Sequence, residues 1–413
     1  MSRTAELSKS ARLRERAEAV IPWGTQTNAK RPVGPLADAL PAFIERARGC
    51  RIVDPDGREY VDYRSSLGPI ILGHGHPAVD AAVRGQLDKG VLFSMASPLE
   101  ADLAYAVREA VPGAEMVRFT KTGGEAMAAC VRLARTVTGR DRLVITGYHG
   151  WQDPFAAPGS PGVPRAVQDL TLRCPYGDRE ALARTFAEHK GEIAAVVTAP
   201  YDWGTDASGD FLRAARELTG ADGALLVYDE VLTGFRLALG GGAEHFGVVP
   251  DLAGYAKALA NGFPLAAFTG RADVMREALD RTIVTTTYAG ETLSLAAASA
   301  TVRTMRDEPV HDTIWRRGRE LMDGLASVLR THGLPGQLVG LPPLFNLTFE
   351  DAGERGADLY RRFYTGLLRR GVFSTGIWCL SYAHGEREVE QTLAAATAAA
   401  RDAVAGAGES RRR

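Results

Sequence analysis

Lysine is scarce in this chain, and one lysine lies in an unusually apolar stretch. The six lysines are at positions 9, 30, 89, 121, 190 and 257, while arginine supplies nearly all other positive charge. Because arginine stays protonated, only these six side chains could act as an amine nucleophile. Lys257 stands in GYAKALANGFPLAAF, where partial burial would lower its pKa and make the amine more nucleophilic. A lysine that reaches solvent from an edge strand is the alternative, but the apolar neighbours favour a reactive amine.

A second candidate is an acidic residue at the end of an apolar run. Residues 224–228 (ALLVY) lie between Gly223 and the pair Asp229-Glu230, which is typical of a buried parallel strand. In open α/β sheets, ligand groups lie just past the carboxyl ends of such strands. Asp229 could therefore pair with the protonated ring nitrogen of a ligand, since a buried carboxylate needs a partner. A helix-capping aspartate explains the same residue equally well.

A third candidate is the glycine pair in the segment RFTKTGGEA, between an apolar run at 116–120 and a helical pattern at 123–138. Free N–H groups at a helix N-terminus bind phosphate, and Gly123 and Gly124 would let a phosphate approach closely. The alternative is a simple helix cap, because Thr122 and Glu125 have the spacing of a capping box. The segment matches neither the Walker motif nor the pattern GxGxxG.

The fourth candidate is the aromatic Tyr148 in GYHGW, which follows the apolar run 143–146. An aromatic ring just past a strand can stack on a planar cofactor, although packing of the loop onto the core is commoner. His149 could be catalytic or a metal ligand, but no second histidine lies four residues away. Phosphate cradle, aromatic ring, carboxylate and lysine, each past a different strand, together describe a site for pyridoxal 5'-phosphate (PLP).

Alternation of short apolar runs with helical segments predicts the element that positions these residues. From about residue 77 the pattern indicates an α/β domain with a mostly parallel sheet and helices on both faces. The expected strands include 116–120, 143–146, 194–198, 224–228 and 265–269, and the expected helices include 79–87, 98–110 and 123–138.

The two ends of the chain predict a smaller α+β domain. The alternating segment 43–63 around the turn at 54–57 is a hairpin signature. The later chain predicts helices at 313–331, 357–370 and 386–404 and a strand at 345–349. We therefore expect residues 1–70 (an N-terminal helix and the hairpin) and 311–413 to contribute to the small domain, and residues 71–310 to form the large PLP-binding domain.

Composition excludes several classes of protein. With 413 residues, 24% charged and 45% hydrophobic, the chain is typical of a globular protein of more than one domain. A net charge of −1 gives no basic surface for nucleic acid, and no apolar run approaches the roughly 20 residues of a membrane helix. The first 20 residues lack the apolar core of a secretory signal. Four widely spaced cysteines favour a reducing cytoplasm over disulfides or a zinc cluster, and we expect no metal site.

The sequence resembles the class III (fold type I) PLP-dependent aminotransferases, especially the branch of glutamate-1-semialdehyde 2,1-aminomutase. The resemblance runs through GCRIVDPDGREYVDY, LGHGHP, TKTGGEA, YHGW, VYDEVLTGFRLALGG, YAKALANGFPLAAF and SYAHGEREVEQTL. It implies that Lys257 is the Schiff-base lysine, Asp229 the partner of the pyridine nitrogen and Tyr148 the stacking ring. It also implies that the turn Thr122-Gly123-Gly124 binds the phosphate and that Thr287 reaches the phosphate of a second subunit, in a homodimer with shared active sites.

Three departures from the family pattern concern the substrate. The usual Ser-Gly-Ser/Thr turn is Thr122-Gly-Gly124, the Glu-Pro after a strand is Ala199-Pro200, and the loop after YHG is shortened to residues 157–164. Acidic residues cluster in the loops expected near the site instead: Asp153, Asp202, Asp206 and Asp210. We therefore expect Trp151, Asp153 and Asp202 to contact a polyhydroxylated or cationic amino compound, such as an amino sugar, an aminocyclitol or another natural-product (antibiotic-type) intermediate.

The predicted reaction is transfer of an amino group from a donor to a ketone or aldehyde. The same site could instead serve a 2,1-aminomutase of the glutamate-1-semialdehyde type, or an epimerase or isomerase acting on an amine-bearing carbon. A non-catalytic relative that binds a phosphorylated ligand is a further alternative. A nicotinamide oxidoreductase is disfavoured, because the glycine run 240–242 lacks both GxGxxG spacing and a preceding strand.

Overall fold

The computed structural model describes residues 8–203, 208–349 and 353–410 of the chain. These residues divide into two compact units, one built from residues 1–76 and 312–413 and the other from residues 77–311. No helix in the part of the chain that the structure describes is both long and apolar enough to cross a membrane.

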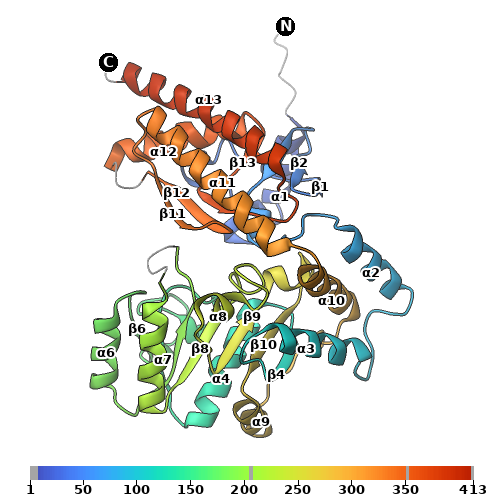
Figure 1. Cartoon of the computed structure of the whole chain (residues 1–413), viewed down its shortest axis with the longest axis vertical. Helices are drawn as coiled ribbons and strands as arrows, with labels where there is room; N and C mark the ends of the chain where they lie inside the picture. The colour runs from blue at the N-terminus through green and yellow to red at the C-terminus, as the bar shows by residue number, and fades with distance from the viewer. Residues whose placement is uncertain (1–7, 204–207, 350–352, 411–413) are drawn as a thin grey trace. The chain divides into compact units, whose positions relative to one another are not determined.

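A seven-stranded sheet forms the centre of the second unit (Figure 1). Its strand order is β4-β10-β9-β8-β7-β5-β6, and only β10 runs antiparallel to its neighbours. The strands are β4 (Met116–Thr120), β5 (Arg142–Ile145), β6 (Thr171–Arg173), β7 (Ile193–Thr198), β8 (Leu225–Glu230), β9 (Leu252–Tyr255) and β10 (Ala266–Gly270). All six residues of β7 are buried, which explains why this strand is a continuous apolar run rather than an alternating one.

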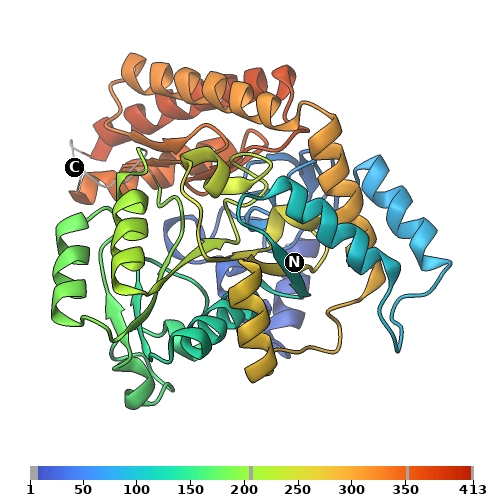
Figure 2. The same ribbon diagram turned by 60° about the horizontal axis from the view of Figure 1, so that its bottom comes forward.

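Helices cover both faces of this sheet, as the alternating pattern predicts. α4 (Gly123–Thr138) connects β4 to β5 in one direction along the sheet, whereas α6 (Arg179–Glu188) and α7 (Asp210–Asp222) return in the other. Because parallel crossovers are right-handed, this reversal places α4 on the face opposite α6 and α7. α6 and α7 lie side by side (Figure 2). The other helices of the unit are α2 (Pro77–Leu87), α3 (Pro98–Ala110), α5 (Arg165–Gln168), α8 (Gly241–Phe246), α9 (Ala272–Arg281) and α10 (Thr292–Asp307).

The core beneath α4 fixes the position of its N-terminus. One face of α4 is buried against β-strand residues such as Val197, Val227 and Phe268, together with Met275 of α9. The helix ends at Gly139, whose φ of 67° is the left-handed conformation that glycine adopts at helix ends. The start of α4 is therefore held rigidly at the carboxyl end of β4.

The first unit contains two small sheets. β1 (Arg46–Arg48), β2 (Arg51–Val53), β3 (Glu59–Asp62) and β13 (Val372–Phe373) form one, and β11 (Gln337–Leu341), β12 (Leu344–Thr348) and β14 (Ile377–Cys379) form the other. The hairpin of β2 and β3 turns at Asp54–Gly57, where Gly57 has a φ of 86° and Asp54 Oδ1 accepts N–H groups of Asp56 and Arg58. β13 joins β3 in parallel, so the two ends of the sequence share one sheet.

Long helices pack on these sheets and complete the first unit. Its helices are α1 (Lys9–Glu18), most of α11 (Val310–Thr331), α12 (Gly353–Leu368) and α13 (Glu386–Ser410). α12 packs along α13. After α1 ends at Glu18, the chain forms three short 3₁₀ turns, at Pro22–Gly24, Asn28–Lys30 and Gly34–Leu36.

Candidate functional site

The predicted site residues follow strands that end at one edge of the seven-stranded sheet. β4 and β9 both run antiparallel to β10, so β4 points in the same direction as β9, β8, β7 and β5. Residues 122–124 follow β4, Lys257 follows β9, Asp229 ends β8, Asp202 follows β7 and Tyr148 follows β5. The topology therefore gathers five separate segments at the edge where α/β proteins bind ligands.

The turn at the start of α4 is both a helix cap and a cluster of free donors. Thr122 Oγ1 accepts the N–H of Glu125 at 3.2 Å, and Glu125 Oε2 accepts the N–H of Thr122 at 2.9 Å. This capping box leaves the N–H groups of Gly123 and Gly124, the first two residues of the helix, without an acceptor in the described protein. The helix-cap and phosphate-binding interpretations of this turn are therefore compatible, because the capped helix still has two free N–H groups that could bind an anion.

Asp229 is held by a histidine that lies 80 residues away in the sequence. Its Oδ2 lies 2.8 Å from Nδ1 of His149, and its Oδ1 accepts the N–H of Val231 at 3.0 Å. The His149 side chain is fully buried, while 11% of the Asp229 side chain is exposed. The histidine is therefore a partner that orients this carboxylate. No group of three or more potential ligands that could hold a metal ion occurs among the described residues.

The second nitrogen of the buried His149 ring is also buried. This atom, Nε2, makes no hydrogen bond within the described part of the chain. Since buried polar atoms are nearly always hydrogen-bonded, such an atom marks a place where a further group belongs. From the sequence, His149 could have been linked to Asp229 only through the expectation that a buried carboxylate needs a partner.

Lys257 stands in a strained backbone conformation directly after β9. Its φ of 40° lies in the left-handed region, which is costly for a residue with a side chain, at about 1–3 kcal/mol. It opens the short helix η6 (Lys257–Ala260), whose other three residues are buried, and α10 packs against this turn. Lys257 itself is only half-buried. The surrounding core thus holds the backbone in place while the side chain remains accessible, as expected of a functional residue.

Tyr148 and Trp151 lie on an exposed loop rather than in the core. Their side chains are 79% and 82% exposed, respectively, so neither packs the loop onto the sheet. Gly147 and Gly150, with φ of 75° and 123°, turn the chain sharply on either side of the buried His149. Asp153 follows as an exposed residue, and Phe155 two residues later is buried and anchors the loop.

The predicted acidic cluster is only partly assembled. Asp202 is half-buried, and burial raises its pKa against the opposing effect of His149. Asp210 is instead the first residue of α7, where it forms an exposed ion pair with Arg213. Asp206 lies outside the described residues. Asp210 is thus bound within its own helix, which argues against the expected place in a substrate site.

The shortened loop at 157–164 is held by a single glutamine. Gln168 Oε1 accepts the N–H of Gly159 at 2.6 Å, and its Nε2 donates to the carbonyls of Ser160 and Val163 at 3.0 and 2.7 Å. Three hydrogen bonds from one side chain make this loop a compact turn, with little freedom to reach over the sheet edge.

Thr287 lies on an exposed turn that is linked to the glycine turn by an ion pair. Glu291 caps α10 through the N–H groups of Leu293 and Ser294, and its Oε2 lies 2.9 Å from Nζ of Lys121, the residue before Thr122. Both side chains of this pair are largely buried, at 15% and 14% exposed. The pair fixes the start of α10, just after Thr287, relative to the turn at 122–124.

A buried carboxyl next to Asp229 supports the strand end. Glu230 Oε2 accepts N–H of Gly242 at 3.0 Å and the hydroxyl of Thr233, and Oε1 accepts N–H of Ala243 at 2.8 Å. Burial raises the Glu230 pKa to about 7, against the lowering effect of these three donors. The glycine run 240–242 is therefore explained by packing: a Cβ on Gly241 would lie 2.8 Å from Glu230 Oε2.

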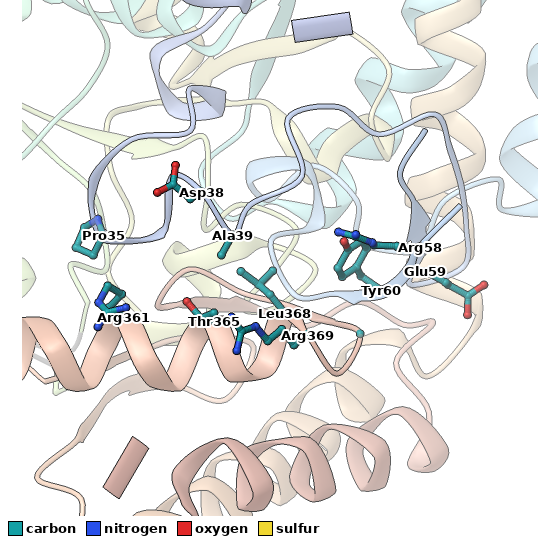
Figure 3. Close-up of a pocket in the computed structure, with 11 residues that line it drawn as sticks. Pro35, Asp38, Ala39, Arg58, Glu59, Tyr60, Arg361, Thr365, Leu368 and Arg369 are labelled. Atoms are coloured by element: carbon teal, nitrogen blue, oxygen red, sulfur yellow. The ribbon is translucent and has the colours of Figure 1, made fainter. Parts of the chain in front are cut away.

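The first unit contains a separate cavity of about 570 Å³ (Figure 3). It is lined by residues of the β2–β3 hairpin, by the segment around Asp38 and by α12. Its charged side chains, such as Arg58, Arg361 and Arg369, are exposed, and Arg361 pairs with Asp358 at 2.7 Å. None of the predicted site residues lines this cavity.

Comparison with known proteins shows the family. The family described as "Aminotransferase class-III" matches residues 34–379. The chain is 36% identical to a glutamate-1-semialdehyde 2,1-aminomutase of Syntrophus aciditrophicus over 421 aligned positions, which cover 94% of this chain and 96% of that protein. The chain therefore belongs to the class III aminotransferases.

Solved structures place the fold in the same class. The FumI protein of Sphingopyxis sp. MTA144, determined in its PLP internal aldimine form, is 30% identical with a TM-score of 0.91 and 97% coverage of both chains. An omega-transaminase of Sphaerobacter thermophilus is 32% identical with a TM-score of 0.89, covering 97% of this chain and 98% of that one. The protein is a PLP-dependent enzyme of fold type I, as the resemblance implies.

The sheet edge fits this cofactor. Two unpaired helix amides and a glycine turn suit its phosphate, a carboxylate held by a buried histidine suits a protonated ring nitrogen, and a half-buried lysine suits its aldehyde.

Proposed function

We propose that this enzyme is an aminotransferase, which moves an amino group from a donor to an aldehyde or ketone of a small molecule. One observation carries the proposal: Lys257, the His149-bound Asp229 and the free amides of α4 lie at a single sheet edge. We assign the phosphate of PLP to Thr122, Gly123 and Gly124, and its aldehyde to Lys257.

Each residue at the edge then has one task in the reaction. When bound, PLP supplies an aldehyde that condenses with amines and a ring that takes up the electrons of a carbanion. Asp229 holds a proton at the pyridine nitrogen, and His149 fixes the carboxylate that does so. The Lys257 amine would hold the aldehyde of the cofactor and, when free, would act as the base that removes and returns the proton at the substrate carbon. Tyr148, whose side chain is 79% exposed, would cover the face of the cofactor ring.

We assign the substrate to polyhydroxylated or cationic amino compounds, such as amino sugars, aminocyclitols or related natural-product intermediates. After β7, this chain has Ala199 where many relatives have a glutamate, so that carboxylate is missing here. The half-buried Asp202 lies three residues later. The carboxylates of Asp202 and of Asp153 on the neighbouring loop would accept hydrogen bonds from hydroxyl or ammonium groups, and the Trp151 ring would pack against the substrate.

A panel assay tests this assignment. The enzyme is incubated with several amino donors against keto sugars, keto-cyclitols and semialdehydes, and both the aminated product and the keto acid from the donor are measured. Stoichiometric keto product together with an aminated sugar or cyclitol is the expected result. Turnover restricted to glutamate-1-semialdehyde would rule out the proposed substrate class.

The second candidate function is a 2,1-aminomutase. It is favoured by identity to aminomutases of 34–36% over nearly the whole chain. An aminomutase returns the amino group to an adjacent carbon of the same molecule, so it needs no separate donor and releases no keto product. Measuring whether product forms without an added donor separates the two functions.

We also propose a homodimer in which Thr287 reaches the phosphate of the second copy. Thr287 is exposed, and the apolar side chains Ile283 and Tyr288 beside it are 75% and 58% exposed. A second copy would remove this apolar surface from water. Sedimentation equilibrium tests the dimer, and mixing Lys257→Ala with Thr287→Ala tests sharing: partial recovery of activity is expected only when each site combines residues of two chains.

A further inference from the structure

Gln152 lies directly against the turn that we assign to the phosphate. A Cβ added to Gly124 would lie 2.0 Å from Gln152 Nε2, and a Cβ added to Gly150 would lie 2.3 Å from Oε1. Both distances are shorter than real Cβ contacts, so a side chain at position 124 or 150 would require the carboxamide to move. A glycine at 124 thus makes room for this side chain.

The carboxamide is a polar group without a partner in the described protein. Its Oε1 is buried and makes no hydrogen bond, and Nε2 donates to no group among the described residues. Leaving buried polar atoms unpaired is costly, and such atoms call for an explanation. The amides of Gly123 and Gly124, at the start of α4, also lack acceptors among the described residues.

These donors converge on one place. The first two amides of α4 point away from the helix, and the Nε2 end of Gln152 lies over Gly124, at the same end of that helix. A group rich in acceptors, such as a phosphate, satisfies these three donors, because each phosphate oxygen accepts more than one hydrogen bond. The acceptor Oε1 is not paired by it and lies closer to Gly150. An apolar or cationic group at this position would leave every donor unpaired.

We propose that Gln152 determines specificity for the phosphate group of PLP, by donating its amide hydrogen to a phosphate oxygen. It takes the space that a serine or threonine side chain at position 124 would occupy, and supplies the donor that such a hydroxyl would supply. This inference rests on the proposed placement of the phosphate at the start of α4.

The test compares PLP with pyridoxal, which lacks the phosphate. Apo-enzyme is titrated with each, and the dissociation constant is read from the visible absorbance of the bound cofactor. We expect Gln152→Ala to weaken PLP binding about 10- to 100-fold and pyridoxal binding less than about 2-fold. Gln152→Glu, which places a negative charge beside the phosphate, should weaken PLP binding further while again sparing pyridoxal.

Two results would overturn the proposal in distinguishable ways. Equal weakening of PLP and pyridoxal, or no weakening of either, would show that Gln152 only packs the loop. Wild-type enzyme that binds the two ligands equally well would instead contradict the placement of the phosphate itself. Gln168→Ala is the matched control, because it loosens the adjacent loop at 157–164 without touching the glycine turn; it should leave the PLP-to-pyridoxal ratio unchanged.

A double variant tests the pairing of glutamine and glycine. Gly124→Ser alone should weaken PLP binding, because its Cβ collides with the carboxamide. The double variant Gly124→Ser with Gln152→Ala should recover affinity to within about 3-fold of wild type, because the new hydroxyl then replaces the lost donor. Circular dichroism of each apo-variant confirms that it is folded. Additive losses in the double variant would refute the exchange of one donor for the other.

Discussion

The cofactor edge and the substrate loops of the same site are built in opposite ways. The cofactor edge is defined by the turn at 122–124, Asp229, Glu230 and Lys257. There Asp229, Glu230 and Lys257 are buried or half-buried, and Thr122, Asp229 and Glu230 have fixed hydrogen-bond partners. In the loop at 148–153, Tyr148 and Trp151 are about four-fifths exposed and contact little. Chemistry that is common to a family requires rigid geometry, whereas substrate choice resides in loops that tolerate change.

The contrast between edge and loops explains why similarity to other proteins shows the family and the cofactor but not the substrate. Family membership and the use of PLP are shown by similarity over nearly the whole chain. Relatives that are 30–36% identical match this chain, and those with solved structures share its fold. The proposed substrate residues, such as Asp202 and Trp151, lie instead in loops outside the strands. The same fold supports many reactions, so the loops must be tested separately from the edge.

The largest expected effect comes from removing the lysine of the cofactor edge. Lys257→Ala should lower kcat at least about 1,000-fold and abolish the visible absorbance of the lysine-bound cofactor, because no other amine can move the proton. Stopped-flow transamination assays and absorbance spectra measure both. Lys190→Ala, an exposed lysine on the surface, serves as control. Retained activity in the Lys257 variant would disprove the assigned role.

Removal of the carboxylate should be the next largest change. Asp229→Ala should retain part of the PLP but lower kcat about 100-fold or more, because the ring nitrogen loses the group that keeps it protonated. His149→Gln keeps a polar group beside Asp229 and should cost about 10-fold, as it disturbs only the orientation of the carboxylate. If the histidine variant lost as much as the aspartate variant, His149 would take part in the chemistry directly.

The buried Glu230 predicts a dependence of stability on pH. Its pKa is about 7 in the folded chain against an ordinary value of 4.5, so between these values the folded state keeps a proton that the unfolded state loses. This group's stabilising contribution is therefore complete below pH 4.5 and is lost as the pH rises through 7, by at most about 3 kcal/mol. Urea unfolding at pH 5 and 7.5 should show the loss in wild type and not in Glu230→Gln.

Thr233→Val checks the cause of that titration. The Thr233 hydroxyl lowers the Glu230 pKa, so its removal should move the loss of stability to higher pH. Identical pH slopes in wild type and Glu230→Gln would show that this carboxyl does not titrate between the two values.

The smallest effect is expected in the substrate loops. Asp202→Asn should raise KM for a hydroxylated or cationic substrate about 5- to 10-fold with little change in kcat or in PLP affinity, because it weakens binding without touching the cofactor edge. Asp210→Asn is the matched control, since that carboxylate pairs with Arg213 at the start of α7. A fall in kcat with unchanged KM would show that Asp202 acts in the chemical step rather than in substrate binding.

Much of the fold follows from local sequence. The buried run ending at Asp229, the capped start of α4 and the Asp54–Gly57 turn all occur as predicted, because each depends on neighbours within a few residues. Asp210, by contrast, pairs with its neighbour Arg213 at the start of α7. Local periodicity carries no information on which of several local partners a charged side chain selects.

The sequence by itself determined the strand–helix alternation, the scarcity of lysine and the glycine turn, and these point to PLP chemistry. Only the tertiary structure decided that His149 orients Asp229 across 80 residues, that Lys257 takes a left-handed backbone, and that Gln152 fills the space over Gly124. The physical reason is the separation along the chain over which each kind of interaction acts. Strand and helix signals arise between adjacent residues, whereas pairing of buried polar groups depends on the register in which distant strands meet at the sheet edge.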